Sequence, residues 1–291
     1  MHLLSQKKWP ILIGLAPAII VYFLFAIIPI VISFYYSLMD WDGFTKMTFV
    51  GLANFKEVFN DPIFWQSLKN NLYVLAASVF GQVPIALFFA LLLNRKLKGG
   101  KFFRTVGFMP VVISTVVISL VWGMMYNARI GLFNQFLKII GLEQWAQNWL
   151  GDPKWAMVSV SITIIWQFVG LYLIIFLAAL QNIPQEIYDA SEIDGASGLK
   201  QTIYIVLPMI WDTIIVAVIL CISGSLRTFD LIYVMTSGGP GHATEVMAMY
   251  MFDKTFSSTR YGYGSAISLC IFFFSLALIY ISNLILRRKT V

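Results

Sequence analysis

Six stretches of this 291-residue chain stay apolar over about 20 residues or more, so each is long enough to cross a hydrocarbon layer of about 30 Å. Backbone groups in lipid must find their hydrogen bonds within the protein, which favours helices for these stretches. The sequence therefore predicts an all-α integral membrane protein with six transmembrane helices. Their approximate bounds are 11–37, 71–94, 105–127, 157–180, 203–227 and 265–286.

The composition agrees with a membrane location. Only 12% of the residues are charged and 59% are hydrophobic, whereas soluble domains carry about a quarter of charged residues. Cys221 and Cys270 both lie inside apolar stretches, so no disulfide framework is expected. The first stretch is too long for a cleaved signal peptide and contains Pro17 and Pro29 without a small-residue cleavage site, so we expect it to be a true span.

Lysine and arginine gather beside the ends of some spans, and such clusters mark the cytoplasmic side. This rule places both termini and the loop 181–202 in the cytoplasm. The formal net charge of +6 is then explained by topology signals and by contacts with anionic membrane lipids, and no nucleic acid partner is expected. The dense clusters are Arg95, Lys96, Lys98, Lys101 and Arg104, and Arg287, Arg288 and Lys289.

The loop 181–202 is rich in acids and in small residues. Asn182 followed by Gln185 resembles a capping box, and Pro184 suits the first turn of a helix. Gly195 is expected to end this short helix. Its small tip lets the surface of another protein approach closely. Helix signals alone also fit an ordinary cytoplasmic loop.

The order of residues in this loop resembles the "EAA loop" of binding-protein-dependent ABC importers. That motif usually starts with glutamate and has alanine third, so Asp189 and Ser191 are conservative departures. The matching residues, which the resemblance identifies as the coupling site for an ATPase, are Asp189, Ala190, Ser191, Asp194, Gly195, Ala196, Leu207 and Pro208.

Further landmarks extend the resemblance over nearly the whole chain, to the six-span permeases of carbohydrate importers. They include Trp9-Pro10, Gly51-Leu52-Ala53-Asn54 and Thr236-Ser237-Gly238-Gly239-Pro240. The resemblance implies that residues 1–291 form a single transmembrane permease domain, with a cytoplasmic coupling helix between spans 4 and 5. It also implies a location in the cytoplasmic membrane of a prokaryote.

The resemblance implies several partners. The chain has no phosphate-binding loop of the G-x-x-x-x-G-K-[ST] kind, because Gly99-Gly100-Lys101 is too short and lacks the hydroxyl residue. We therefore expect no cofactor on this chain, and we expect ATP and Mg on two copies of a separate nucleotide-binding subunit. A second, different six-span permease would complete a heterodimer, and an external solute-binding protein would deliver a sugar.

Polar and small residues inside spans 4 and 5 suggest a substrate pathway, since such groups usually face a cavity or a neighbouring helix. Aromatic rings suit the apolar face of a sugar, and amides and hydroxyls suit its hydroxyl groups. Close packing of small residues between helices is the alternative explanation. The pathway residues are Trp166, Gln167, Gly170, Cys221, Gly224, Ser225 and Thr228.

Charged residues near the ends of span 5 have structural explanations. Arg227 and Asp230 are three residues apart, which predicts a helical ion pair if the helix continues there. Asp212 lies near the inner end, where it can extend to water.

The external segments carry signals of their own. Residues 38–70 and 128–156 are rich in aromatic residues, which fits an aromatic belt at the membrane interface or a docking rim for the binding protein. The segment Gly238-Gly239-Pro240-Gly241 predicts a tight turn.

No enzymatic function is indicated. His2 and His242 are the only histidines, and neither stands in a metal-ligand or nucleophile motif, so no catalytic or metal-binding residue is predicted. The expected function is a permease subunit for a sugar, and a neutral oligosaccharide is preferred because Arg227 is the only cation near the pathway. The alternatives are an importer of glycerol-phosphate or a polyol, an ion-coupled secondary transporter, and a scaffold without transport activity.

Overall fold

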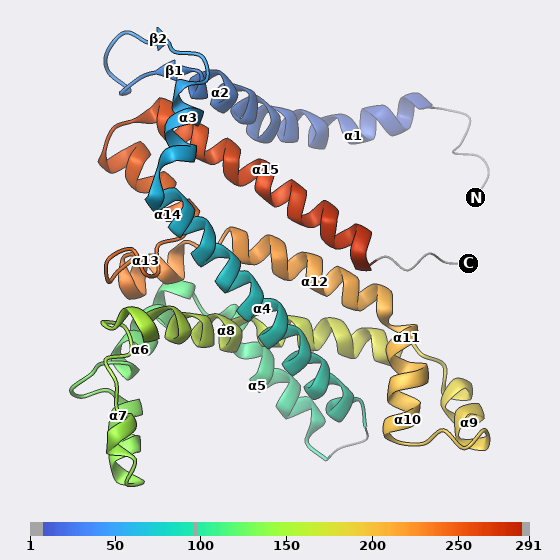
Figure 1. The fold of residues 1–291 in the computed structure, drawn as a ribbon. Helices are drawn as coiled ribbons and strands as arrows, with labels where there is room; N and C mark the ends of the chain where they lie inside the picture. Colours follow the sequence, from blue (N-terminus) through green and yellow to red (C-terminus); the bar gives the residue numbers. More distant parts are fainter. Residues whose placement is uncertain (1–7, 96–97, 287–291) are drawn as a thin grey trace. The chain divides into compact units, whose positions relative to one another are not determined.

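A computed structural model describes residues 8–95 and 98–286 of the chain. These residues cluster into two compact units (Figure 1). Unit 1 contains the described residues up to Asp61 together with residues 251–272, and unit 2 contains the rest. Lys96, Arg287, Arg288 and Lys289 lie outside the described residues, as do His2 and both chain ends, so the membrane orientation stays a prediction. The single permease domain over residues 1–291 also stays a prediction.

Unit 1 contains a long apolar helix and a small polar cap. The cap is held by side chains: Asn54 donates from Nδ2 to the carbonyls of Ser37 and Met39, and Arg260 pairs with both carboxylate oxygens of Glu57 at 2.7 and 2.6 Å. This guanidinium lowers the pKa of Glu57. The elements are α1 (Lys8–Tyr22), a π-turn (Phe23–Ile27), α2 (Ile28–Ser37), β1 (Met39–Asp40) paired antiparallel with β2 (Thr48–Phe49), α3 (Ala53–Asn60) and a π-turn (Asp253–Ser257).

Unit 2 is formed by helices. They are α4 (Pro62–Asn94), α5 (Gly100–Val112), α6 (Thr115–Met125), α7 (Leu132–Ile139), a 3₁₀ turn (Glu143–Trp145), α8 (Pro153–Gln181), α9 (Gln185–Ile193), α10 (Leu199–Gln201), a π-turn (Thr202–Val206), α11 (Leu207–Met209), α12 (Trp211–Leu226) and α13 (Asp230–Thr236). Two helices, α14 (Met247–Phe252) and α15 (Tyr261–Leu286), begin in one unit and end in the other.

All six predicted apolar stretches are helical, but two of them are bent. Four helices are long and apolar enough to span a membrane alone: Ile13–Ser37, Pro62–Leu93, Pro153–Gln181 and Tyr261–Leu286. The pairs Gly100–Val112 with Thr115–Met125 and Leu199–Met209 with Trp211–Leu226 bend by 98° and 69°. The predicted helical membrane class is confirmed, and the count reaches six only when each bent pair is one span.

Two prolines follow π-turns. Ile28 donates its amide to Phe23 and Leu207 donates to Thr202, so the helix widens by one residue just before Pro29 and Pro208. Proline has no amide hydrogen and its ring displaces the carbonyl one turn earlier, which explains the local change of hydrogen-bond spacing.

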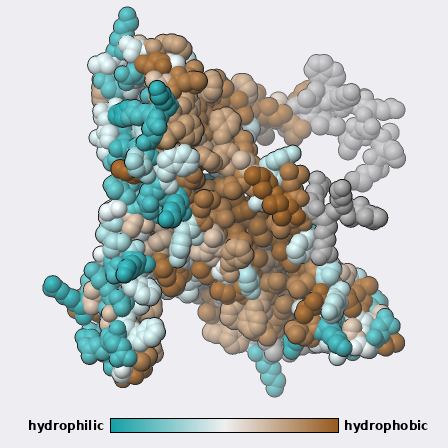
Figure 2. Space-filling view, in the orientation of Figure 1, coloured by the Kyte–Doolittle hydropathy of each residue, from teal (hydrophilic) through white to brown (hydrophobic). Residues whose placement is uncertain are grey.

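Small residues bring the central helices of unit 2 together. Ala86 and Ala90 of α4 are fully buried, in one cluster with Phe176 and Leu180 of α8 and Ala217 of α12. The cluster lets three helices pack closely and supports the site on its polar side. Figure 2 shows the hydrophobic surface over these helices, and hydrophilic residues around α7 and α9, which lie at opposite ends of unit 2 (Figure 1).

Candidate functional site

The short helix predicted between spans 4 and 5 is present as α9, but its start differs from the prediction. Pro184 occupies the N-cap position, and no side chain caps the helix there. Asn182 instead ends α8, where its backbone amide donates to the carbonyls of Ala179 and Leu180. The predicted capping box is therefore wrong. Gln185 donates to the carboxylate of Asp189 at 3.0 Å within the helix.

The end of α9 follows the prediction. Asp194 is the C-cap and Gly195 has φ +78°, the left-handed conformation that favours glycine. The backbone amide of Gly195 donates to the carbonyl of Glu192, and that of Ala196 donates to the carbonyl of Ser191. These two bonds are the pair that defines a Schellman motif. Three of the predicted coupling residues thus form the turn itself.

One side of α9 is fixed to the rest of unit 2. Tyr188 packs against the central cluster, and Ser191 is buried. Gln201 donates to the hydroxyl of Ser191 at 2.6 Å and to the carbonyl of Tyr188 at 3.2 Å. Ser191 therefore contacts the chain's own α10, away from the exposed side of the helix.

The opposite side of the loop is uncovered. Asp189 and Ala190 are exposed, Ile193 is 86% exposed and Leu199 is 76% exposed. A side chain at Gly195 would meet no described atom within 4 Å. Such exposed apolar residues in a polar loop fit a protein contact.

Leu207 and Pro208 join the loop to α12. Leu207 packs against the central cluster, and Pro208 lies two residues before Ile210, where the chain bends by 69° into α12. The structure therefore places Pro208 close to this bend. Asp212 is exposed in the first turn of α12, in agreement with contact to water.

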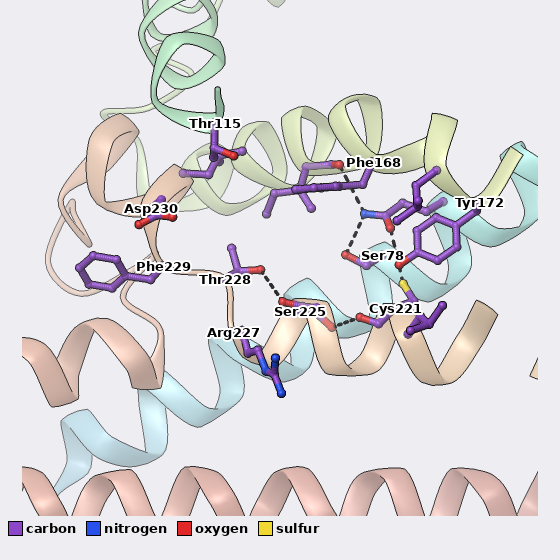
Figure 3. Close-up of a pocket in the computed structure, with 16 residues that line it drawn as sticks. Ser78, Thr115, Phe168, Tyr172, Cys221, Ser225, Arg227, Thr228, Phe229 and Asp230 are labelled. Carbon is purple, nitrogen blue, oxygen red and sulfur yellow. Dashed lines mark hydrogen bonds between the residues drawn. The ribbon is translucent and has the colours of Figure 1, made fainter. Parts of the chain in front are cut away.

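A cavity of about 300 Å³ opens between α4, α6, α8 and the C-terminal end of α12 (Figure 3). Four predicted pathway residues of span 5 line it together: Cys221, Gly224, Ser225 and Thr228. The apolar wall comes from Phe168 and Tyr172 of α8 and from Phe229.

The polar wall is organised by Gln82, which is almost fully buried. Its amide nitrogen lies 3.4 Å from the hydroxyl of Ser78 and from the carbonyl of Ile164, and its oxygen accepts from the thiol of Cys221 at 3.6 Å. Ser78 and Gln82 were not predicted as site residues. Two polar residues one helical turn apart inside an apolar stretch are a signal that could have identified them.

The cavity meets α8 on a different face from the predicted one. Trp166, Gln167 and Gly170 are not among its lining residues. Trp166 lies 5.3 Å from the ring of Trp122, and Gln167 is buried and donates to Thr115 at 3.0 Å. A side chain on Gly170 would come within 2.0 Å of the carbonyl oxygen of Gly107 in α5, so this glycine allows close helix packing.

The predicted ion pair between Arg227 and Asp230 is wrong. The helix ends at Leu226, Arg227 is its C-cap, and Asp230 starts α13, so the two residues do not share a helical turn. Figure 3 shows the guanidinium of Arg227 pointing away from the space between Phe168 and Thr228.

The loop before α14 is tied to the cavity wall by two asparagines of α4. Asn70 donates to the carbonyls of His242 and Glu245 at 3.0 and 2.8 Å. Asn71 accepts from the amide of Met247 at 2.7 Å and donates to the carbonyl of Ser225 at 3.3 Å. The predicted tight turn is present in this loop, with positive φ at Gly238 and Gly241.

Residues 82–291 match the protein family described as "Binding-protein-dependent transport system inner membrane component". The chain belongs to this permease family. The permease is 39% identical over 279 residues to the probable ABC transporter permease protein YurN of Bacillus subtilis, with 95% of each chain covered. The predicted family resemblance is confirmed.

Two further comparisons were found, one in sequence and one in fold alone. The permease is 37% identical over 257 residues to the trehalose/maltose transport system permease protein MalF of Thermococcus litoralis, covering 88% of this chain and 86% of the relative. A chain of the solved bacterial alginate ABC transporter in complex with alginate pentasaccharide-bound periplasmic protein has the same fold, with a TM-score of 0.84, 23% identity and coverage of 98% and 96%.

Proposed function

We propose that this permease is the membrane subunit of an ATP-driven importer that passes a neutral oligosaccharide from an external solute-binding protein into the cytoplasm. The composition of the cavity carries the proposal. Rings of Phe168 and Tyr172 face hydroxyl and amide groups of α4 and α12, which suits a ligand with both apolar ring faces and hydroxyl groups. The relative named for trehalose and maltose transport supports the same substrate class.

The size of the cavity fits part of such a ligand. Its volume of about 300 Å³ lies at the lower end of the range of about 300–1,000 Å³ for small-molecule sites. A cavity of this size suits one or two sugar units of a chain. A second, different permease subunit would supply the facing wall.

The loop 181–202 supports the proposal that a separate ATPase subunit provides the energy for transport. Its exposed residues, including Asp189, Ala190 and Ile193, offer a surface for a nucleotide-binding subunit that carries ATP and Mg. Movement of α9 would pass to α10 through the bonds from Gln201 to Ser191 and Tyr188. It would continue through Pro208 into α12, whose outer end lines the cavity.

The alternatives are less well supported by the cavity. A glycerol-phosphate ligand needs cations, and among the described lining residues the one cation, Arg227, points away. An ion-coupled carrier needs ion-binding groups near the membrane centre. The one acid among those lining residues is Asp230, beyond the end of α12.

The first experiment is purification from the native membrane in mild detergent, with the mass of every bound protein measured. ATPase activity is then followed with the binding protein, with and without oligosaccharides, a polyol or glycerol-3-phosphate. We expect an ATPase, a second permease, and stimulation by a neutral oligosaccharide. Recovery of this chain alone, with uptake abolished by an ionophore and independent of ATP, would rule out the proposal.

A further inference from the structure

Helix α7 has an exposed apolar face outside the predicted spans. Leu132, Phe136 and Ile139 are 64%, 61% and 82% exposed. Their spacing of four and three residues places them along one side of the helix. Three large apolar residues on one uncovered face of a short helix indicate a surface that has an apolar partner.

The other side of α7 is firmly held, so the exposed face has a fixed direction. Phe133 stacks on Tyr126 with ring centroids 5.0 Å apart. Asn134 is buried and donates to the carbonyls of Ala128 and Gln147 at 3.0 and 2.8 Å, while its oxygen accepts from the indole of Trp149 at 2.8 Å. The exposed residues therefore do not result from a loosely attached helix.

Further contacts hold the segment around α7 beside the first turns of α8. Trp149 packs against Trp155 at 5.7 Å, and its carbonyl accepts from Ser159, whose own carbonyl accepts from Tyr126. Helix α8 has 29 residues and a length of about 44 Å, which exceeds a hydrocarbon core of about 30 Å. The predicted span starts near residue 157, so in a bilayer that α8 crosses its first two turns, which include Trp155 and Ser159, are expected at the boundary between headgroups and acyl chains. Helix α7 is then expected at the same level.

We propose that the Leu132, Phe136 and Ile139 face of α7 inserts into the lipid interface of the bilayer. Figure 1 shows α7 running across the direction of α8, as a helix in the membrane plane would. Lys138 lies on another side and pairs with Glu143 at 3.3 Å. Apolar residues on one side and a charge on the other are typical of interfacial helices.

The following turn adds an anchor. Trp145 is exposed in the 3₁₀ turn after α7, and tryptophan favours the membrane interface. The inference requires that α8 crosses the bilayer, and it does not depend on the substrate or on the coupling loop. A solute-binding protein is the competing occupant of this face, and the experiment separates the two.

The test uses nitroxide labels on the assembled importer in lipid nanodiscs. Labels are attached at Phe136→Cys, Ile139→Cys or Lys138→Cys in the otherwise unmodified chain, whose own Cys221 and Cys270 are buried. The chain without an introduced cysteine is the labelling control, and only importers with normal stimulated ATPase activity are compared. We expect the ratio of oxygen to nickel-chelate accessibility to be several-fold higher at positions 136 and 139 than at 138, with no change when binding protein is added.

Two outcomes would overturn the inference. Equal nickel accessibility at all three positions would show that the face is in water. Protection from both reagents at 136 and 139, whether constant or dependent on the binding protein, would show that a protein covers it. A label-free measurement gives the same decision: lipids brominated near the headgroup should quench tryptophan fluorescence less in Trp145→Phe than in the unmodified chain, and unchanged quenching would contradict the inference.

Discussion

The proposed coupling loop and the cavity of unit 2 are built in opposite ways. The loop is continuous in sequence from Gln185 to Pro208, and it leaves apolar side chains such as Ile193 exposed. The cavity takes its walls from four separate segments, and it buries polar side chains such as Gln82. A site made by one segment reveals itself in the order of residues, whereas a site made by packing reveals only which helices contribute.

The largest expected effect tests the loop. Gly195→Asp adds charge and bulk to an open turn, so transport should fall by tenfold or more while the chain still inserts and assembles. Asp tolerates a positive φ better than most residues, so little of the effect should come from the backbone. Uptake and stimulated ATPase activity in proteoliposomes measure it.

Gly141→Asp is the matched control. Gly141 has φ +76° and, like Gly195 at +78°, has no described atom within 4 Å of an added side chain. It lies after α7, far along the chain from the coupling residues. Normal transport by both variants would show that the loop is not a coupling surface, and equal loss in both would point to the backbone.

The next effect tests which face of α8 meets the sugar. Phe168→Leu should raise the half-saturating sugar concentration for uptake about tenfold, or on the order of 1.4 kcal/mol, because a ring contact is lost from the cavity wall. Trp166→Leu, two residues earlier and not in that wall, should change it little. A larger effect of Trp166→Leu than of Phe168→Leu would show that the sugar contacts the face of α8 that the sequence predicted.

A smaller effect is expected at the polar wall. Gln82→Leu removes the amide that bonds to Ser78 and Cys221 and thereby organises the polar wall. Because this wall is proposed to bind the sugar, sugar affinity should weaken by about 1 kcal/mol. Direct binding of labelled sugar to the assembled importer measures this change. Gln135→Leu, on the exposed surface of α7, is the control. Unchanged binding in Gln82→Leu would remove this side chain from the site.

The smallest effect sharpens the description of the loop. Ser191→Ala removes a hydrogen bond to Gln201, which should lower stability by about 1 kcal/mol and leave coupling intact because Ser191 faces the permease itself. Thermal unfolding and stimulated ATPase activity are measured together. Loss of stimulation at unchanged stability would mean that the hydroxyl acts in coupling.

The sequence predicted the loop better than the cavity for physical reasons. The end of α9 depends on neighbouring residues, since only the chain near Gly195 forms its Schellman bonds. The face of α8 depends on how α4 and α5 pack against it. Gly170 suggested room for a sugar, but the approach of Gly107 fills that room. Likewise, nothing next to Arg227 marks the end of α12, because Leu226 is an ordinary helix-forming residue.

Asn71 has a consequence for how the permease moves. One fully buried amide holds the carbonyl of Ser225 in the cavity wall and the amide of Met247 at the start of α14. Both segments are therefore attached to the same side chain of α4. The C-terminal end of α12 can therefore move only together with α4 and the start of α14, or by giving up a buried hydrogen bond to Asn71. The opening of the cavity at this point is thus linked to the position of the loop before α14.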